Sequence, residues 1–394
     1  MSAPTAAGVA APITAGRAVL GTELPAAGVG PGAAVAGRAA AGSSGALTGA
    51  AGTGDQGTAA SGAATAGTQS GGSSAGAGRD TGGAGGMSGS GSCDVPAPVG
   101  ALIGWAAVSG MGVDTTSGGG NAPRKTVYTL SELTAAVSGN TPGVVYVKGK
   151  LQAGSLSIGS NKTIVGLCGA ELHGHLSISA ASNIIVRNLK IVGYAVGDCS
   201  LDPKFQASEG CSSGQDAITV QNAHHVWFDH CDVSDGTDGN LDITNGADFV
   251  TVSWTRFHYS PRMDPVGNDS TGASGHRFSN LIGGADGVAA DVGHLNVTWH
   301  HNWWADNVDQ RMPRTRAGKI HVLNNLFTAK GNSYCTNAGA GATLLVEGNV
   351  YVGVKNPLQP TADGDMRAQD NLFTSTSGTN SASGMGFTPP YPYT

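Results

Sequence analysis

The chain has 394 residues, of which only 12% are charged, and its formal net charge is −6. This length allows two or three domains, but no run of 18 or more apolar residues occurs, so we predict no membrane span. The N-terminus also lacks a basic segment followed by an apolar one, so no signal peptide is expected.

The first 92 residues contain no Phe, Trp or Tyr and consist mainly of Ala, Gly, Ser and Thr. Only six of their side chains are charged. Such a composition buries too little apolar surface to offset the entropy lost on ordering the chain. We therefore predict a disordered low-complexity tail over residues 1–92 and one folded domain over residues 93–394.

A short helix is predicted at Thr129–Ser138, where the sequence reads TLSELTAAVS. We interpret Ser131 as its N-cap, because a serine hydroxyl can accept a hydrogen bond from the first helical turn. In a solenoid, a helix at this place covers the first coil and hides an exposed sheet edge.

Six segments with one common pattern follow from Ile184 onward. Their first, third and eighth places are apolar: IIVRNLKI, VWFDHCDV, VTVSWTRF, VTWHHNWW, IHVLNNLF and LLVEGNVY. The third places are separated by 42, 24, 47, 23 and 24 residues. We therefore predict a unit of about 23 residues with two doubled intervals, and a further rung at Phe278. KTIVGLCG lies one unit upstream, and the pattern fades after Asn356.

These segments predict strands rather than helices, because apolar and polar residues alternate and Gly, Asn and Asp separate the runs. A leucine-rich repeat shares the period, but its LxxLxL signature is absent. We therefore predict an all-β parallel β-helix. Asn302, Asn325 and Asn349 occupy the sixth places of the last three segments. We expect them to form turns and a ladder of hydrogen-bonded amides.

Aspartates concentrate between Gly214 and Asp242. Positions 22–26 residues apart lie one coil apart in such a fold, so we predict Asp216 beside Asp238 and Asp242. Three converging carboxylates repel one another unless a cation joins them. Oxygen ligands without a thiolate favour Ca²⁺ over zinc.

Other polar residues nearby have a simpler interpretation. For Asp232 and Asp235 we prefer hydrogen bonds within turns. Five histidines are expected to be strand residues with satisfied imidazoles rather than metal ligands: His224, His225, His230, His300 and His301.

A basic loop separates two alternating runs in residues 293–325. Four of the chain's 21 Lys and Arg residues fall within nine positions: Arg311, Arg314, Arg316 and Lys319. An isolated cluster of this kind is usually a solvated turn, whereas a loop held between strands is also where functional sites lie. The upstream aspartates favour the second interpretation, because they supply a cation site.

Six cysteines lie at or after Cys93, and none forms a CxxC pair, which argues against a zinc or thioredoxin site. Cys199 and Cys211 bracket a polar loop and are candidates for a disulfide, as in secreted domains. A cytosolic protein with six buried free thiols is the alternative. We favour export.

Three ordered stretches of the chain resemble pectate lyases of polysaccharide lyase family 1. They contain VWFDH, then DGNLDI followed by VTVSW, then RMPRTR followed by HVLNN, and the resemblance extends over roughly Val99 to Val354. It implies a right-handed parallel β-helix that cleaves α-1,4-linked polygalacturonate by Ca²⁺-dependent β-elimination, giving 4,5-unsaturated products. We expect a secreted monomer whose partner is an acidic polysaccharide, and no nucleic-acid partner.

The resemblance also implies residue roles. Asp216, Asp238 and Asp242 fall on the calcium-binding carboxylates of the family. Arg311 falls on the base that removes the C5 proton, and Arg316 falls on a substrate-binding arginine.

The expected substrate-binding residues are Arg262, Arg314 and Arg316. Two positions depart from the family pattern, one in this set and one at the expected calcium site. Arg262 stands where the family usually has a lysine that grips the substrate carboxylate. An arginine can hold a carboxylate through two hydrogen bonds, so binding is expected to survive with altered geometry. Gly214 stands where some members carry a further acidic ligand, which weakens the expected calcium site.

Three other functions fit parts of the sequence. A pectin lyase acting on methyl-esterified pectin shares the fold but does not need the acidic residues. A non-catalytic, polysaccharide-binding β-helix or adhesin has no use for Arg311 and Arg316. A hydrolase needs two clustered carboxylates and leaves the RMPRTR loop without a role.

Overall fold

The computed structural model describes residues 100–194, 199–208, 214–261, 276–339 and 341–393. The predicted tail, its boundary at residue 93, Cys211 and Arg262 lie outside these ranges. None of the helices within them is long and apolar enough to cross a membrane.

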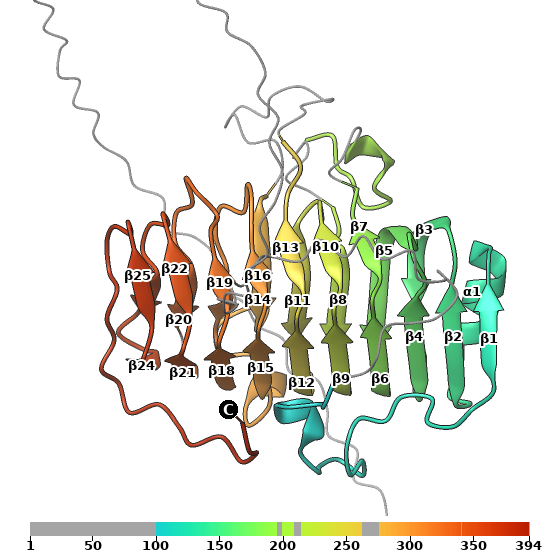
Figure 1. The fold of residues 1–394 in the computed structure, drawn as a ribbon, viewed down its shortest axis with the longest axis horizontal. Helices are drawn as coiled ribbons and strands as arrows, with labels where there is room; N and C mark the ends of the chain where they lie inside the picture. The colour runs from blue at the N-terminus through green and yellow to red at the C-terminus, as the bar shows by residue number, and fades with distance from the viewer. Residues whose placement is uncertain (1–99, 195–198, 209–213, 262–275, 340, 394) are drawn as a thin grey trace, which may run out of the picture. The chain divides into compact units, whose positions relative to one another are not determined.

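The folded part is a stack of coils, and its strands form three parallel columns (Figure 1). The first column is a 10-stranded sheet, which we call the first sheet. Its strands are β1 (Arg124–Val127), β2 (Gly143–Val147), β4 (Lys162–Gly166), β6 (Ser182–Arg187), β9 (His224–Asp229), β12 (Asp248–Ser253), β15 (Val297–His300), β18 (Lys319–Leu323), β21 (Thr343–Glu347) and β24 (Asp365–Gln369).

The second and third columns are joined through β5 (Glu171–Ser179), which also pairs with β3 (Lys150–Ser157). The second column contains β7 (Lys190–Val192), β10 (Asp232–Ser234), β13 (Arg256–His258), β16 (Trp303–Trp304), β19 (Leu326–Phe327), β22 (Val350–Val352) and β25 (Leu372–Thr374). The third column contains β8 (Ile218–Gln221), β11 (Gly239–Thr244), β14 (Phe278–Ile282), β17 (Arg314–Thr315), β20 (Thr336–Ala338) and β23 (Leu358–Pro360).

The predicted parallel β-helix and its register are confirmed in the first sheet. The third places of the six segments, together with one residue of KTIVGLCG, pair in an unbroken row: Ile164, Val186, Phe228, Val252, Trp299, Val322 and Val346. The six from Val186 onward are fully buried, and burying one such side chain contributes about 1.5–3 kcal/mol. The period of the sequence therefore reports a column of core residues.

The two long intervals are single coils with inserted loops, so the prediction of doubled intervals is wrong. Val186 pairs directly with Phe228, and Val252 pairs directly with Trp299. Phe278 is not a further rung of the first sheet, because it begins β14 in the third column and pairs with Gly239. An inserted loop and an additional coil lengthen the interval alike, so spacing alone does not distinguish them. The insertions flank the third column.

The predicted asparagine ladder is confirmed, and it is longer than expected. Asn302 Nδ2 donates to Asn325 Oδ1 at 3.1 Å, Asn325 Nδ2 to Asn349 Oδ1 at 2.9 Å, and Asn349 Nδ2 to Asn371 Oδ1 at 2.9 Å. We call these four residues the asparagine ladder. The left-handed turn residue is the preceding one, as at Asn324 with φ 52°. The ladder position and the left-handed position are thus adjacent rather than the same.

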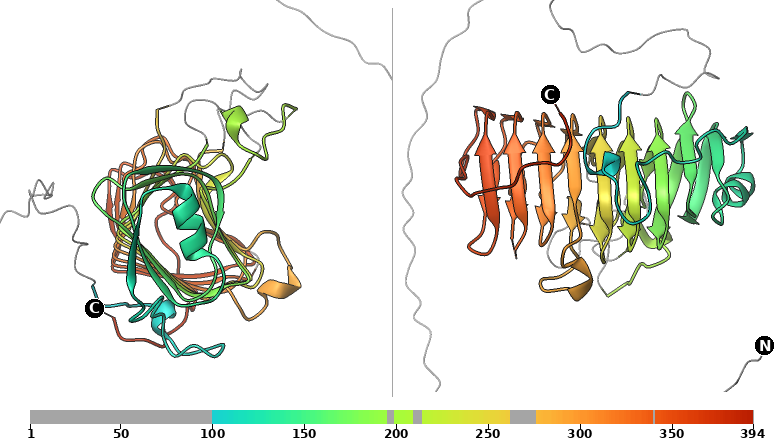
Figure 2. Two further views of the ribbon diagram at one scale, coloured as in Figure 1. Left: turned by 90° about the vertical axis from the view of Figure 1, so that its right-hand side faces the viewer. Right: turned by 90° about the horizontal axis from the view of Figure 1, so that it is seen from below.

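The predicted helix is present as α1 (Leu130–Val137), and it lies across the end of the solenoid (Figure 2). Its N-cap is Thr129 rather than Ser131. The Thr129 hydroxyl accepts a hydrogen bond from the Glu132 amide, and the Glu132 carboxylate accepts one from the Thr129 amide. This reciprocal pair is a capping box, in which the N-cap residue stands three places before a glutamate. Thr129 has this spacing from Glu132, and Ser131 does not.

The C-terminal part contains one more coil than predicted, because β24 continues the first sheet beyond Asn356. The chain then returns across the outside of the first sheet (Figure 2). Tyr391 Oη lies 2.7 Å from Thr298 Oγ1 and 2.9 Å from His321 Nδ1. The Trp105 ring packs against Tyr391 with centroids 5.9 Å apart, so both terminal segments meet on this face.

The cysteines are not all free thiols. Cys168 is disulfide-bonded, whereas Cys231 and Cys335 are free and buried. The alternative of six buried free thiols is therefore wrong, and the suggested pairing of Cys199 with Cys211 falls outside the described residues.

Candidate active site

The third column brings the predicted acidic residues together. Ile218 pairs with Leu241, and the Ala217 amide donates to the Gly239 carbonyl, which places Asp216 beside Gly239 on the next coil. A Cβ at Gly239 would lie 2.8 Å from Asp216 Oδ1 and 3.5 Å from Asp242 Oδ1. Both carboxylates therefore converge on a point that only a glycine leaves open.

These two carboxylates are electrostatically strained. Burial, and after it the charge of Asp238, raise the pKa of the Asp216 carboxyl to about 7. Burial raises the pKa of Asp242 well above its usual range, with further contributions from Asp216 and Asp238, and the charge of Arg311 opposes both increases. Asp216 Oδ1 is buried without a hydrogen-bond partner in the described structure. A buried anionic oxygen without a donor is what a bound cation would satisfy.

Asp238 lies at the rim of this pair. Its side chain is 46% exposed, and its Oδ1 atom is 2.9 Å from His276 Nδ1. Among the described residues, no three His, Cys, Asp or Glu side chains are gathered closely enough to hold a metal ion. The converging oxygens of Asp216 and Asp242 suit a hard cation, and Asp238 beside them has its Oδ1 atom in contact with His276.

Gly214 has a structural reason to lack an acidic side chain. Its φ is +135°, and a Cβ there would lie 2.6 Å from Asp202 Oδ2. The buried Asp202 carboxylate accepts hydrogen bonds from the amides of Lys204 and Gln215, both at 2.8 Å. This carboxylate orders the loop beside the site, and sequence reasoning missed it.

Arg311 lies two coils beyond Asp242, and Phe278 at the start of β14 is on the coil between them. Its φ is +63°, and its carbonyl accepts a hydrogen bond from the Asn280 amide at 2.7 Å. The guanidinium carbon lies 4.1 Å from the centroid of the Phe278 ring, within the range of a cation–π contact. Its Nε atom is buried and has no partner among the described residues. The side chain also hydrogen-bonds Tyr334, so two aromatic residues hold the predicted base.

The other basic residues of the loop separate into different places. Arg314 lies in β17 between Leu281 and Asn337. Lys319 begins β18, so it belongs to the first sheet and not to the site.

Arg316 is more firmly held than predicted. Its Nη1 donates to the carbonyls of Gly283 at 3.0 Å and Gly284 at 2.6 Å, and its Nε lies 3.2 Å from Asp286 Oδ1. Burial, and then the neighbouring charge of Arg314, lower the pKa of Arg316.

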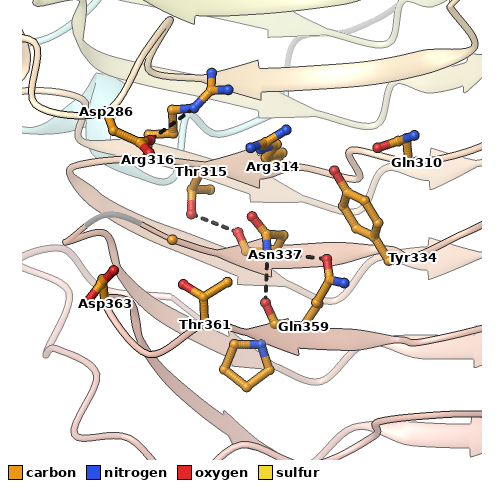
Figure 3. Close-up of a pocket in the computed structure, with 12 residues that line it drawn as sticks. Asp286, Gln310, Arg314, Thr315, Arg316, Tyr334, Asn337, Gln359, Thr361 and Asp363 are labelled. Atoms are coloured by element: carbon orange, nitrogen blue, oxygen red, sulfur yellow. Dashed lines mark hydrogen bonds and ion pairs between the residues drawn. The ribbon is translucent and has the colours of Figure 1, made fainter. Parts of the chain in front are cut away.

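A groove of about 520 Å³ continues from the arginines toward the C-terminal coils (Figure 3). This volume is in the range of sites that bind small ligands. Its lining consists of Asp286, Gln310, Arg314, Thr315, Arg316, Tyr334, Asn337, Gly339, Gln359, Pro360, Thr361 and Asp363. Most of these residues escaped sequence analysis, because they carry no motif and are joined only by the register of the coils.

Comparison with known proteins assigns the family. A family model described as pectate lyase matches residues 44–394. Pectate lyase A of Aspergillus niger is 35% identical over 306 residues, which cover 75% of this chain and 82% of that protein. The chain belongs to the pectate lyase family.

Further relatives agree with this assignment. Pectate lyase E of Dickeya chrysanthemi is 30% identical over 296 residues, covering 64% of this chain and 67% of that protein. Members of the pectate lyase family are polysaccharide lyases, so this family member is an enzyme.

Solved structures of pectate lyases share the fold. A mutant of the Bacillus subtilis pectate lyase matches with a TM-score of 0.59 and 22% identity, covering 75% of this chain and 93% of that one. A Bacillus pectate lyase in complex with trigalacturonate matches with a TM-score of 0.58 and 22% identity, covering 75% and 94%. At this identity the likeness shows the fold alone.

The remaining polar residues of this pectate lyase family member take part in structural contacts. Asp232 Oδ1 lies 2.8 Å from His258 Nε2, and the Asp235 carboxylate accepts from the Ser260 amide at 2.7 Å. Both carboxylates thus bond to the next coil, so the prediction of hydrogen bonds within turns is wrong for Asp232 and for Asp235. Neither residue contacts the acidic pair through a hydrogen bond in the described structure.

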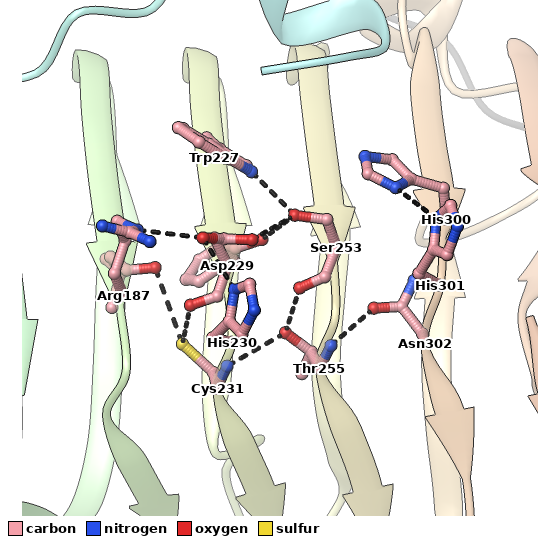
Figure 4. A network of polar contacts seen from close by, with 12 residues as sticks. Arg187, Trp227, Asp229, His230, Cys231, Ser253, Thr255, His300, His301 and Asn302 are labelled. Atoms are coloured by element: carbon pink, nitrogen blue, oxygen red, sulfur yellow. Dashed lines mark hydrogen bonds and ion pairs between the residues drawn. The ribbon is translucent and has the colours of Figure 1, made fainter. Parts of the chain in front are cut away.

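The predicted histidines also stay outside the site. His230 Nδ1 lies 2.9 Å from Asp229 Oδ2. Asp229 is the centre of a buried network that includes Arg187 and Ser253 on adjacent strands of the first sheet (Figure 4). His224 pairs with His225, and His300 with His301, through their Nδ1 atoms at 2.9 and 3.0 Å.

Proposed function

We propose that this member of the pectate lyase family cleaves α-1,4-linked polygalacturonate by Ca²⁺-dependent β-elimination and releases 4,5-unsaturated oligogalacturonates. The observation that carries the proposal is the electrostatic effect of Arg311 on the carboxylates of Asp216 and Asp242, which it exerts across the coil of β14 in the third column. Its charge lowers the pKa of each carboxylate. An acidic pair and a basic loop together suit an anionic polymer bound through a cation.

The cation would be held by Asp216 and Asp242, with Asp238 as a third ligand once it leaves His276. A bound Ca²⁺ supplies positive charge at the substrate carboxylate and stabilises the negative charge that develops when the neighbouring C5 proton leaves. Gly239 keeps the approach to these oxygens free, because a side chain there would contact Asp216.

In this proposal Arg311 removes the C5 proton in its neutral form, after its guanidinium has released a proton to solvent. The electron pair of the C5–H bond forms the C4–C5 double bond, the C4–O bond breaks, and the departing oxygen takes up a proton from solvent. The Phe278 ring and Tyr334 position the guanidinium. Arg314 and Arg316 bind substrate carboxylates on the same side of the column, and Arg262, outside the described residues, is proposed to do the same.

The proposed setting is extracellular, with the enzyme acting as a monomer. The disulfide at Cys168 supports this location, because disulfides persist in oxidising compartments.

The test is an elimination assay on polygalacturonate with added Ca²⁺ or with a chelator, following the absorbance of the unsaturated product. We expect product only with calcium. Absence of unsaturated product with calcium present would contradict the proposal. Calcium-independent activity that prefers fully methylated pectin would instead indicate a pectin lyase.

A further inference from the structure

The electrostatic character of the groove changes along the third column. Arg314, Asn337 and Gln359 pair in register on successive strands. Since adjacent strands lie about 4.8 Å apart, the row places one cation first and two neutral amides over the next roughly 10 Å. A polymer that lies along this row meets a different partner on each coil (Figure 3).

Among the described residues that line the groove, none at its far end offers a cation to a free carboxylate. Arg316 lies near the opposite side, where its charge is paired with Asp286. Asp363, on an exposed turn, adds a negative charge to the groove lining on the other side of Thr361 from Gln359 (Figure 3). A carboxylate placed there would meet like charge.

The polar groups at this end match an ester instead. Gln359 Oε1 accepts from Asn337 Nδ2 at 3.3 Å, which fixes the amide and leaves its Nε2 donor without a partner among the described residues. The adjoining Pro360 adds an apolar ring to the lining. One free donor beside an apolar surface suits the carbonyl and the methyl group of a methyl ester.

We propose that Gln359, Pro360 and Asp363 form a subsite for a methyl-esterified galacturonate unit. This inference rests on the proposed function and specifies its substrate: partially esterified pectin, with a free carboxylate toward Arg314 and an ester toward Gln359. The subsite selects by rejecting charge as well as by binding the ester.

The test compares kcat/KM on partially methyl-esterified pectin with kcat/KM on polygalacturonate. Asp363→Asn removes the repelling charge, so the ratio of the two should fall roughly two- to fivefold through better use of polygalacturonate. Gln359→Met keeps the length of the side chain but removes the donor, so the ratio should fall about threefold through poorer use of the ester. The two variants separate charge from hydrogen bonding.

Asp370→Asn is the matched control. Asp370 is exposed, lies outside the groove lining and has a φ of 56° that asparagine tolerates, so the ratio should not change. Mass spectrometry of the wild-type products should place methyl esters at one fixed position relative to the unsaturated end.

The outcomes distinguish the subsite from the activity on which it rests. No unsaturated product from either polymer contradicts the proposed function. Product from polygalacturonate, with an unchanged ratio in both variants or with esters at random positions, overturns the subsite alone. If the variants change kcat/KM only on pectin that carries neutral sugar side chains, the subsite is also overturned. The groove would then bind such a side chain instead.

Discussion

Two polar columns run along the same solenoid, and they are built to opposite rules. In the asparagine ladder, the amides of Asn325 and Asn349 find partners on the coils above and below. In the third column, Asp216 Oδ1 and Arg311 Nε are buried without partners in the described structure. Both columns belong to the same stack of coils, but insertions flank the third column and its side chains differ.

This contrast separates stability from function. Stacking one residue type on itself is favourable for an amide, which both donates and accepts, but unfavourable for a carboxylate, which only accepts. The ladder therefore stabilises the coils, whereas the acidic pair destabilises them until a cation or substrate arrives. Groups left unsatisfied by the fold are available for binding.

The largest expected effect is a loss of catalytic activity, at the third column. Arg311→Ala should lower kcat/KM on polygalacturonate about 10²–10⁴-fold, the usual contribution of a general base. The melting temperature should change little, because this side chain is not part of the apolar core. Lys319→Ala, from the same basic cluster but exposed on the first sheet, should retain activity. Equal losses in both variants would mean that general charge, and not this base, matters.

The next effect is on the ladder. Asn325→Ala removes a buried amide that donates to Trp299 O and Asn349 Oδ1 and accepts from Asn302. The free energy of unfolding should fall by about 3 kcal/mol, because several groups lose partners and a cavity forms. Urea denaturation measures it. Asn371→Ala, at the partly buried end of the ladder, should cost only about 1 kcal/mol, and a cost as large as that at Asn325 would refute the ladder account.

A smaller effect is expected on stability, because the acidic pair of Asp216 and Asp242 destabilises the folded protein. The folded-state pKa of Asp216 lies above its unfolded value, so the folded, calcium-free protein binds more protons between about pH 4 and pH 7. The free energy of unfolding should therefore fall as the pH rises through that window. Asp216→Asn should reduce this slope when unfolding is followed in chelator at several pH values, and the remainder should come from Asp242, whose pKa burial also raises. A slope that persists undiminished in the variant would assign the effect to other groups.

The smallest effect is at the edge of the groove. Asp286 is 72% exposed where it pairs with Arg316, and exposed pairs contribute little. Asp286→Asn should lower KM for polygalacturonate less than about threefold, by freeing the Arg316 charge for substrate. Steady-state kinetics at two salt concentrations tests this, since added salt should reduce the difference. A rise in KM would mean that Asp286 positions Arg316 productively.

Much of the fold follows from the sequence, because the third-place residues that set the period are core residues and each occupies the same place on its coil. What the period missed were the inserted loops, such as the one that places Phe278 in the third column instead of the first sheet. Insertions change the spacing without changing the apolar pattern. The N-cap was also misplaced, because Ser131 and Thr129 are both good caps and only the reciprocal contact with Glu132 decides between them.

The site was predictable only in part. Asp216 and Asp242 lie close together because they are on adjacent coils. Their separation in the sequence predicts this. Asn337 and Gln359 line the groove for the same reason, yet they carry no charge or motif that would mark them. The contact of Asp238 with His276 depends on how side chains are placed on either side of an inserted loop. The repeat period of the sequence does not predict that placement.

The returning C-terminal segment changes how such a solenoid comes apart. Repeat proteins usually behave as a line of neighbours, so their ends can peel away one unit at a time. Here Tyr391 contacts Thr298 in β15 and His321 in β18, while Ala106 donates to Thr251 in β12. The segments around Ala106 and Tyr391 are thus both bonded to the middle of the stack, so they hold the central coils together, and the stack should resist unfolding one coil at a time from its two ends.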